Sequence, residues 1–129
     1  MKDKWSHLTS TRGPDAKFLE ICYSGGADPL KNALLSSPPS VRQRIIVLAI
    51  APSVIIPKSL CFKSDNYVSR RDFVTHLDFV GKMRYGNELR VLEPHPDAKF
   101  WDHEFLSPTF NDVKYNHIAD YIKNYAGKK

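Results

Sequence analysis

The sequence predicts an α/β fold, with a parallel sheet of about four strands and helices on both faces. Ile45–Ala51 is a continuous apolar run rich in β-branched residues, which is typical of a parallel strand covered on both sides. Strand-like segments alternate with segments whose apolar residues recur at helical spacing. Short breaker sequences such as Ser24-Gly25-Gly26 separate the two kinds of segment. Right-handed crossover connections in one open sheet are the simplest arrangement of this order.

Four strands are expected, and they are short segments bounded by turn residues. They are Phe18–Tyr23, Ile45–Ala51, a weaker one within Ser59–Lys63 centred on Leu60–Lys63, and Glu88–Glu93, of which Leu89–Glu93 is the firmest part. Helical spacing is expected around Leu30–Leu34, over Val74–Met83 and over Asn111–Tyr125, with weaker anchors at Trp5 and Leu8.

The last predicted helix has recognisable ends and an apolar stripe. Ser107 before Pro108, or Thr109 with Asp112 three residues later, can cap its start, and Gly127 ends it. The stripe that we expect to be buried consists of Phe110, Val113, His117, Ile118, Tyr121, Ile122 and Tyr125.

Length and composition predict a single folded domain of 129 residues, with residues 1–14 as an extension and 15–127 as the core. Hydrophobic residues make up 42% and charged residues 26%, which suits a globular chain. The formal charge of +5 is scattered and forms no basic stripe with aromatics, so no nucleic-acid partner is expected. The longest apolar run is too short for a membrane span.

The two cysteines, Cys22 and Cys61, lie in apolar segments and are expected to be buried free thiols. Free thiols suit a reducing compartment, so we expect a cytoplasmic location. No cofactor is expected.

Ser24 follows the first predicted strand and precedes Gly25-Gly26. A nucleophilic serine of the elbow type stands on a sharp strand-to-helix turn, with small residues two positions before and after it. Cys22 and Gly26 occupy those positions, and the N–H of Gly25 would donate one hydrogen bond to an oxyanion. An ordinary Ser-Gly turn is the plain alternative. Pro29 also allows the helix to start late, with Asp28 as its cap, which would move the helix N-terminus away from Ser24.

Candidates for an acid and a base follow the later strands. Asp72 is our choice for the acid that orients the imidazole, with Asp65 and Asp78 as competitors. His103 is our choice for the base, on a loop that Trp101, Phe105 and Leu106 would anchor. His95 is the alternative base, and His117 lies on the apolar face of the last helix and is expected to be a core residue.

A metal site is the alternative for this histidine-rich loop. His95, Asp97, Asp102 and His103 are suitable ligand types, but they lack a helical i, i+4 pair or a cysteine pair. We therefore expect no metal. The chain order Ser24, Asp72, His103 is instead that of α/β hydrolases, in contrast to other common serine-triad folds.

Four segments also carry a family resemblance: Ile21–Ala27, Lys31–Leu35, Arg44–Pro52 and, the most specific, Asp102–Phe110. They resemble an uncharacterised protein family of chlamydial bacteria whose C-terminal part is similar to a lipase-like α/β hydrolase. Tyr23 and Gly25 stand where that family has histidine and glutamine. The resemblance implies the fold and the placement of Ser24, Asp72 and His103, and it names no substrate.

The resemblance extends only to the C-terminal half of an α/β hydrolase, so we expect the front half of the fold to be missing. The loop that supplies a second oxyanion donor belongs to that half. The expected function is a serine ester hydrolase, esterase- or lipase-like, that is incomplete for catalysis alone. The alternative is a non-catalytic remnant or interaction module. Expected partners are a complementing N-terminal chain or a second copy, joined through the bare edge of the first strand.

Overall fold

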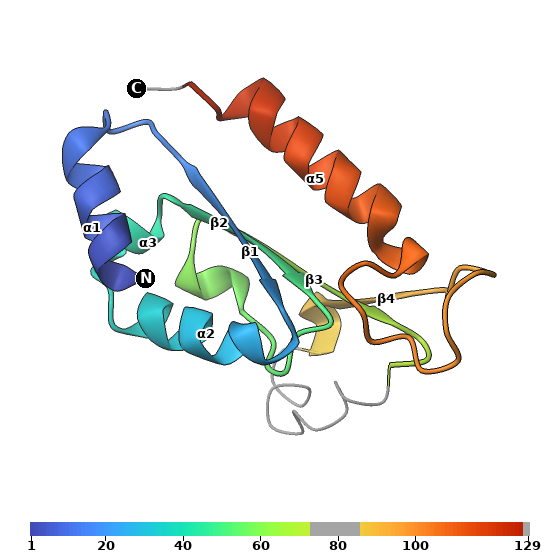
Figure 1. Ribbon diagram of the computed structural model, residues 1–129. Coiled ribbons are helices and arrows are strands. Elements are labelled where there is room, and N and C mark those ends of the chain that lie inside the picture. The colour runs from blue at the N-terminus through green and yellow to red at the C-terminus, as the bar shows by residue number, and fades with distance from the viewer. Residues whose placement is uncertain (73–85, 128–129) are drawn as a thin grey trace.

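The computed structural model describes residues 1–72 and 86–127, and within them a four-stranded, all-parallel sheet carries helices on both faces (Figure 1). The strands are β1 (Phe18–Tyr23), β2 (Ile45–Ile50), β3 (Lys63–Ser69) and β4 (Leu89–Leu92), and they lie in the order β1-β2-β3-β4. The α-helices are α1 (Lys2–Thr11), α2 (Ala27–Leu35), α3 (Pro39–Arg42) and α5 (Asn111–Asn124). The prediction of an α/β fold with a parallel sheet is confirmed. The helix predicted over residues 74–83 lies outside the described residues.

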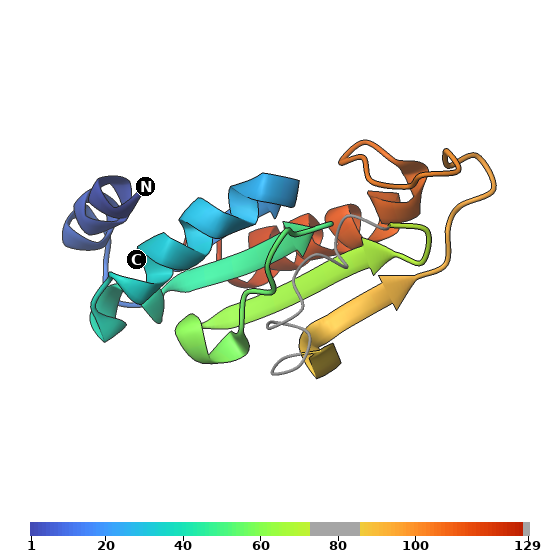
Figure 2. The ribbon, with the colours of Figure 1, turned by 90° about the horizontal axis from the view of Figure 1, so that it is seen from below.

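Strand β2 is the centre of the core, because every one of its side chains is buried. Ile45, Val47 and Ala49 pack into a layer with α1, α2 and α3, whose largest buried contributions include Trp5 and Leu30. Leu48 and Ile50 point to the other face, where the layer includes Tyr67, Phe110 and part of α5. Figures 1 and 2 show α1, α2 and α3 on one side of the sheet and α5 on the other. The alternation follows from the two-residue period of a strand.

The third strand differs from its prediction. Ser59–Lys63 is not a strand: a 3₁₀ turn covers Lys58–Leu60, and β3 begins at Lys63 and continues to Ser69. The prediction was wrong because Ser64, Asp65 and Asn66 are polar, although all three are buried. Polar residues inside a sheet give little strand signal in a sequence.

The buried Asn66 has a structural task in the connection between β2 and β3. Its Oδ1 accepts a hydrogen bond from the N–H of Ile56 (2.9 Å), and its Nδ2 donates to the carbonyl of Ile56 (3.0 Å). The Ser64 hydroxyl donates to the same carbonyl (2.7 Å). Buried backbone groups must be paired, so these two side chains satisfy an irregular connection that no α-helix covers.

Helix α5 buries only part of the stripe predicted for it. Val113, His117, Tyr121 and Tyr125 are half-buried toward the sheet, and the preceding Phe110 is fully buried. Ile118 and Ile122 are 39% and 63% exposed, so their predicted burial was wrong. The helix contacts the sheet through a single row of i, i+4 positions. Ile118 and Ile122 lie outside that row, so the predicted stripe was too wide.

The exposed apolar residues of α5 lie on the side of the helix away from Asp120. Asp120 forms an ion pair with Lys63 on β3 (3.8 Å), so that flank of the helix faces the middle of the sheet. Tyr121 donates to the carbonyl of Lys17, which precedes β1 (2.8 Å). Tyr115, Ile118 and Ile122 continue around the helix in the direction away from Asp120. They form an exposed apolar stripe on the side of α5 away from Asp120. Strand β1 pairs only with β2 among the described residues.

No helix within residues 1–72 and 86–127 combines the length and apolar character that crossing a bilayer requires.

Cys22 and Cys61 are both buried free thiols, as predicted. Burial raises the pKa of Cys22 to about 12 and that of Cys61 to about 11. The thiolate is the reactive form, so both residues should resist alkylation while the chain is folded. We expect iodoacetamide at pH 8 to leave the native protein unmodified by intact mass, and to add two groups once the protein is unfolded in guanidinium. Fast modification of either thiol in native protein would contradict this burial.

Candidate active site

Ser24 stands on a sharp turn at the carboxyl end of β1. Its φ is 49°, in the left-handed region that residues other than glycine seldom adopt. A 3₁₀ turn (Ser24–Gly26) begins at the serine itself, and α2 follows directly at Ala27. The N–H of Ser53 donates to the Ser24 carbonyl (2.9 Å) and helps to hold the turn from the end of β2. This is the local geometry of a nucleophile elbow.

The residues around the elbow lie as close as the spacing predicted. A Cβ built on Gly26 would lie 4.0 Å from the Cβ of Cys22, so strand and helix come within van der Waals contact there. The late helix start, with Asp28 as cap, does not occur. Pro29 lies in the first turn of α2, where its missing N–H costs no helical hydrogen bond, and Asp28 accepts from the Ser53 hydroxyl (2.6 Å). The 3₁₀ turn of Ser24–Gly26 therefore leads directly into α2, and the N–H of Gly25 belongs to that turn.

The structure brings Ser24, His103 and Asp72 together at the carboxyl ends of β1 and β3. Ser24 Oγ lies 2.7 Å from His103 Nε2, and His103 Nδ1 lies 2.7 Å from Asp72 Oδ2. The Asp72 side chain is fully buried, and the imidazole is 18% exposed. An ionised carboxylate only accepts hydrogen bonds, so Nδ1 carries the proton and Nε2 is the acceptor that faces the Ser24 hydroxyl.

The competing candidates lie elsewhere. Asp65 is on the opposite side of β3 from the core layer of α1–α3, where it pairs with Arg90 (3.3 Å) and lies 3.8 Å from His117 Nδ1. Burial lowers the pKa of His117, although the nearby Asp65 opposes the shift, and His117 Nε2 lies 2.8 Å from the Tyr67 hydroxyl. His117 is thus part of a polar network between α5 and β3, as expected of a packed residue. Asp78 lies outside the described residues.

His95 takes no part in the serine contact that His103 makes. Its ring Nδ1 accepts a hydrogen bond from the N–H of Asp97 (3.0 Å). Within residues 1–72 and 86–127, no group of three or more His, Cys, Asp or Glu side chains is arranged to hold a metal ion.

The loop that carries His103 is held differently from the prediction. Trp101 and Leu106 are 62% and 81% exposed, so they do not anchor it by burial. Phe105 does contact the core: its ring lies 6.1 Å from that of Tyr23. The Tyr23 hydroxyl also donates to the carbonyl of His103, so the residue before Ser24 bonds the residue whose ring faces Ser24.

Asp102 is the second anchor of this loop, and its carboxylate is 1% exposed. It accepts hydrogen bonds from Ser107 Oγ (2.5 Å), from Thr109 Oγ1 (2.5 Å) and from the side chain of Ser69. Burial raises the pKa of Asp102, but these three hydroxyls and the charge of Arg71 outweigh it and hold the pKa below its usual value.

Sequence reasoning missed this role of Asp102 and the role of Tyr23. A signal for the first was present, because Asp102, Ser107 and Thr109 lie close together in the sequence. The partner Ser69 is distant in sequence and could not have been found from the chain alone. The hydroxyl of Tyr23 is equally hidden in a segment that is typical of a strand.

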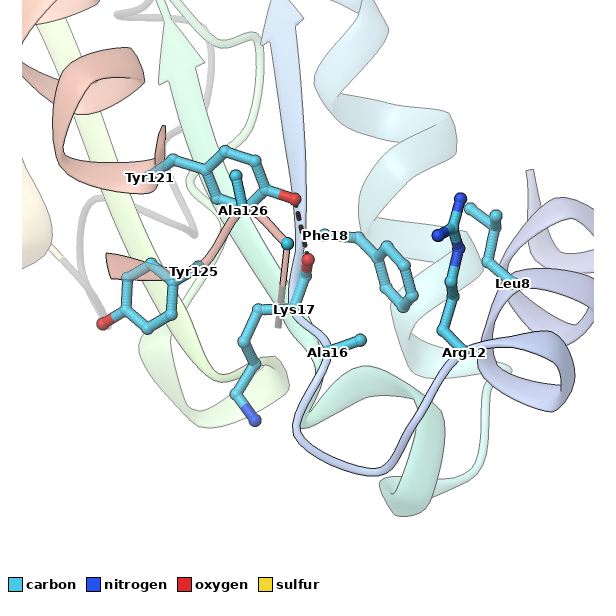
Figure 3. Close-up of a pocket in the computed structure, with 9 residues that line it drawn as sticks. Leu8, Arg12, Ala16, Lys17, Phe18, Tyr121, Tyr125 and Ala126 are labelled. Carbon is cyan, nitrogen blue, oxygen red and sulfur yellow. Dashed lines mark hydrogen bonds between the residues drawn. The ribbon is translucent and has the colours of Figure 1, made fainter. Parts of the chain in front are cut away.

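A cavity of about 250 Å³ lies at the opposite end of β1, between α1, the start of the strand and the end of α5 (Figure 3). Arg12, Phe18, Tyr121 and Tyr125 are among its lining residues. Phe18 begins β1 and Ser24 follows its end, so this cavity is separate from the Ser24 site.

We compared the chain with protein families, curated proteins and solved structures. No family model, curated protein or solved structure matches it. The function of the chain is therefore inferred from the geometry around Ser24.

Asp102 makes a testable contribution to the pH dependence of stability. Its pKa in the folded state is lower than the usual 3.8, so its contribution is fully present above that value and is lost as the pH falls through the lowered pKa. We expect Asp102→Asn to lower the free energy of unfolding at pH 7, and the difference from wild type to shrink as the pH falls below about 4. Urea unfolding at a series of pH values measures this. Asp97→Asn, at an exposed carboxylate, is the control and should follow wild type throughout.

Proposed function

We propose that this chain is a serine hydrolase of carboxylic esters, arranged like the C-terminal half of an α/β hydrolase. The observation that carries the proposal is the continuous line of hydrogen bonds from Ser24 Oγ through His103 to the buried Asp72, which starts at a strained elbow. The order of the three residues in the chain supports the same proposal. So does the resemblance of Asp102–Phe110 to an uncharacterised family whose C-terminal part is similar to a lipase-like α/β hydrolase.

In the proposed reaction, His103 Nε2 takes the hydroxyl proton as Ser24 Oγ attacks the ester carbonyl carbon. The electron pair of the carbonyl π bond moves to the oxygen, and the N–H of Gly25 would donate a hydrogen bond to this oxyanion. The intermediate collapses by expelling the alcohol oxygen, which takes the proton from His103. An acyl group then remains on Ser24. Asp72 accepts from Nδ1–H throughout and stabilises the imidazolium that forms between the two proton transfers.

The second half of the reaction repeats these steps with water. His103 removes a proton from a water molecule, and the resulting hydroxide attacks the acyl carbon. Ser24 leaves with the proton returned from His103, and a carboxylic acid is released. No metal ion or organic cofactor enters these steps.

The rate is expected to be low in the chain alone. In α/β hydrolases a second oxyanion donor comes from a loop beyond the far side of the nucleophile strand. That side of β1 is unpaired among the described residues. One missing donor typically lowers the rate by about 10²–10³. A chain that pairs with this edge would be the natural source of the second donor.

A second candidate function is a non-catalytic interaction module that keeps this half-fold. The free edge of β1 and the exposed Ile118 and Ile122 on α5 favour it. The two candidates differ in whether the Ser24 hydroxyl is activated, and a covalent probe separates them without requiring efficient turnover.

We expect a fluorophosphonate probe to modify Ser24, because phosphonylation requires an activated serine and only one turnover. The measurement is the rate of mass increase of the purified protein, with the modified peptide located by fragmentation. Labelling should disappear in Ser24→Ala, and fall by at least about 10²-fold in His103→Ala, which lacks the base. An activated ester should be hydrolysed slowly by the wild type and at background rate by Ser24→Ala.

Ser36→Ala, at the other end of α2, is the matched control and should be labelled as fast as wild type. Labelling of wild type and Ser24→Ala at one common rate would contradict the hydrolase proposal and favour the interaction module.

We also propose that a second copy of the chain binds at the free edge of β1. A two-fold axis normal to the sheet would set β1 antiparallel to its copy and extend the sheet across the axis. The same axis places the two α5 helices side by side on one face. Their exposed stripes of Tyr115, Ile118 and Ile122 would then contact each other, which covers apolar surface that is otherwise in water.

Sedimentation velocity at a series of concentrations should therefore detect a dimer of the wild-type chain. Each copy carries a charge of +5, so dimerisation should strengthen as salt screens the repulsion. Ile122→Lys should abolish the dimer without unfolding the chain, because this side chain is 63% exposed. Lys31→Ala on the opposite face is the control. A wild-type chain that stays monomeric at high concentration and high salt would exclude the second copy and leave a complementing chain as the partner.

A further inference from the structure

The buried carboxylate of Asp102 connects two loops that are distant in sequence. It directly precedes His103, and it binds Ser107 and Thr109 on its own loop. Its third hydroxyl partner is Ser69, the last residue of β3. A buried carboxylate with three hydrogen-bond donors is strongly fixed in direction, because charge-assisted hydrogen bonds are the stronger kind and leaving one unmade is costly.

Ser69 in turn begins the short turn that carries Asp72. The N–H of Asp72 donates to the Ser69 carbonyl (3.0 Å), and the N–H of Arg71 donates to the Ser69 hydroxyl oxygen (3.3 Å). One residue thus holds the position of Asp72 through its backbone and the position of Asp102 through its side chain. Ser69 therefore contacts both sides of the His103–Asp72 hydrogen bond: the turn that carries Asp72, and Asp102, which precedes His103.

We propose that Asp102 is a positioning residue for the serine-histidine-aspartate line. Its carboxylate ties the loop of His103 to the end of β3 and so sets the hydrogen bond between His103 Nδ1 and Asp72. This role rests on the proposed hydrolase function for its consequence on rate, but the hydrogen bond that it sets can be measured without any reaction. The Asp102 carboxylate hydrogen-bonds Ser107 and Thr109 and acts on His103 through the position of the backbone.

The experiment measures the His103–Asp72 hydrogen bond and the reactivity of Ser24 separately. The first readout is the far-downfield proton resonance of His103 Nδ1–H, assigned by its loss in Asp72→Asn. The second is the rate of fluorophosphonate labelling. The variants are Asp102→Asn and Ser69→Ala, with Asp97→Asn as the matched control at an exposed loop carboxylate.

In folded Asp102→Asn we expect the resonance to move upfield or vanish and labelling to slow by about 10²-fold, the usual effect of a misplacement near 1 Å. Ser69→Ala should change both readouts in the same direction and by less, because it removes one of the three hydroxyls. Asp97→Asn should match wild type in both. If Asp102→Asn does not fold, Thr109→Val decides, because it removes one hydroxyl from Asp102 without removing a hydrogen bond of the turn that carries Asp72.

The outcomes separate this inference from the proposed function. A folded Asp102→Asn with the wild-type resonance and labelling rate would overturn the positioning role and leave the hydrolase proposal intact. If Asp102→Asn loses the resonance and fluorophosphonate does not label the wild type, the positioning role is supported and the hydrolase proposal is contradicted.

Discussion

The parallel pairing of β1, β2 and β3 is the constraint on which the rest of this structure depends. Because the three strands run in one direction, their carboxyl ends meet at one edge, and the residues that follow each strand become neighbours. Ser24 follows β1, and Asp72 follows β3 by one short turn. His103 arrives from the loop after β4 to stand between them. The sequence distance of 79 residues between serine and histidine is closed by sheet topology, not by local structure.

Apolar patterning predicted those parts of the fold in which burial and apolar character coincide. Strand β1 and the fully buried β2 were found to within a residue, and β4 nearly so. The prediction failed at β3, where Ser64 and Asn66 are buried to bind the backbone of Ile56. It failed in the opposite sense on α5, where Ile122 is apolar and exposed. In both cases tertiary contacts, which a single sequence does not display, decide whether a side chain is covered.

The candidate site shows the same division between what is local and what is tertiary. Strand-end position and chain order were enough to select Ser24, Asp72 and His103, since these depend on topology. The support of the site was predicted to be apolar, through Trp101, Phe105 and Leu106. Phe105 does pack against the core, but Trp101 and Leu106 are exposed, and Asp102 and Tyr23 add polar support that was not predicted. Hydrogen-bond partners such as Ser69 lie on other elements, so their pairing with Asp102 appears only once the strands are placed.

Polar support has a physical consequence that apolar support lacks. Apolar packing fixes a loop by volume and tolerates small rotations, whereas a carboxylate that holds three hydroxyls fixes both distance and direction. A serine and an imidazole need that directional accuracy, because proton transfer between them requires a contact near 2.7 Å.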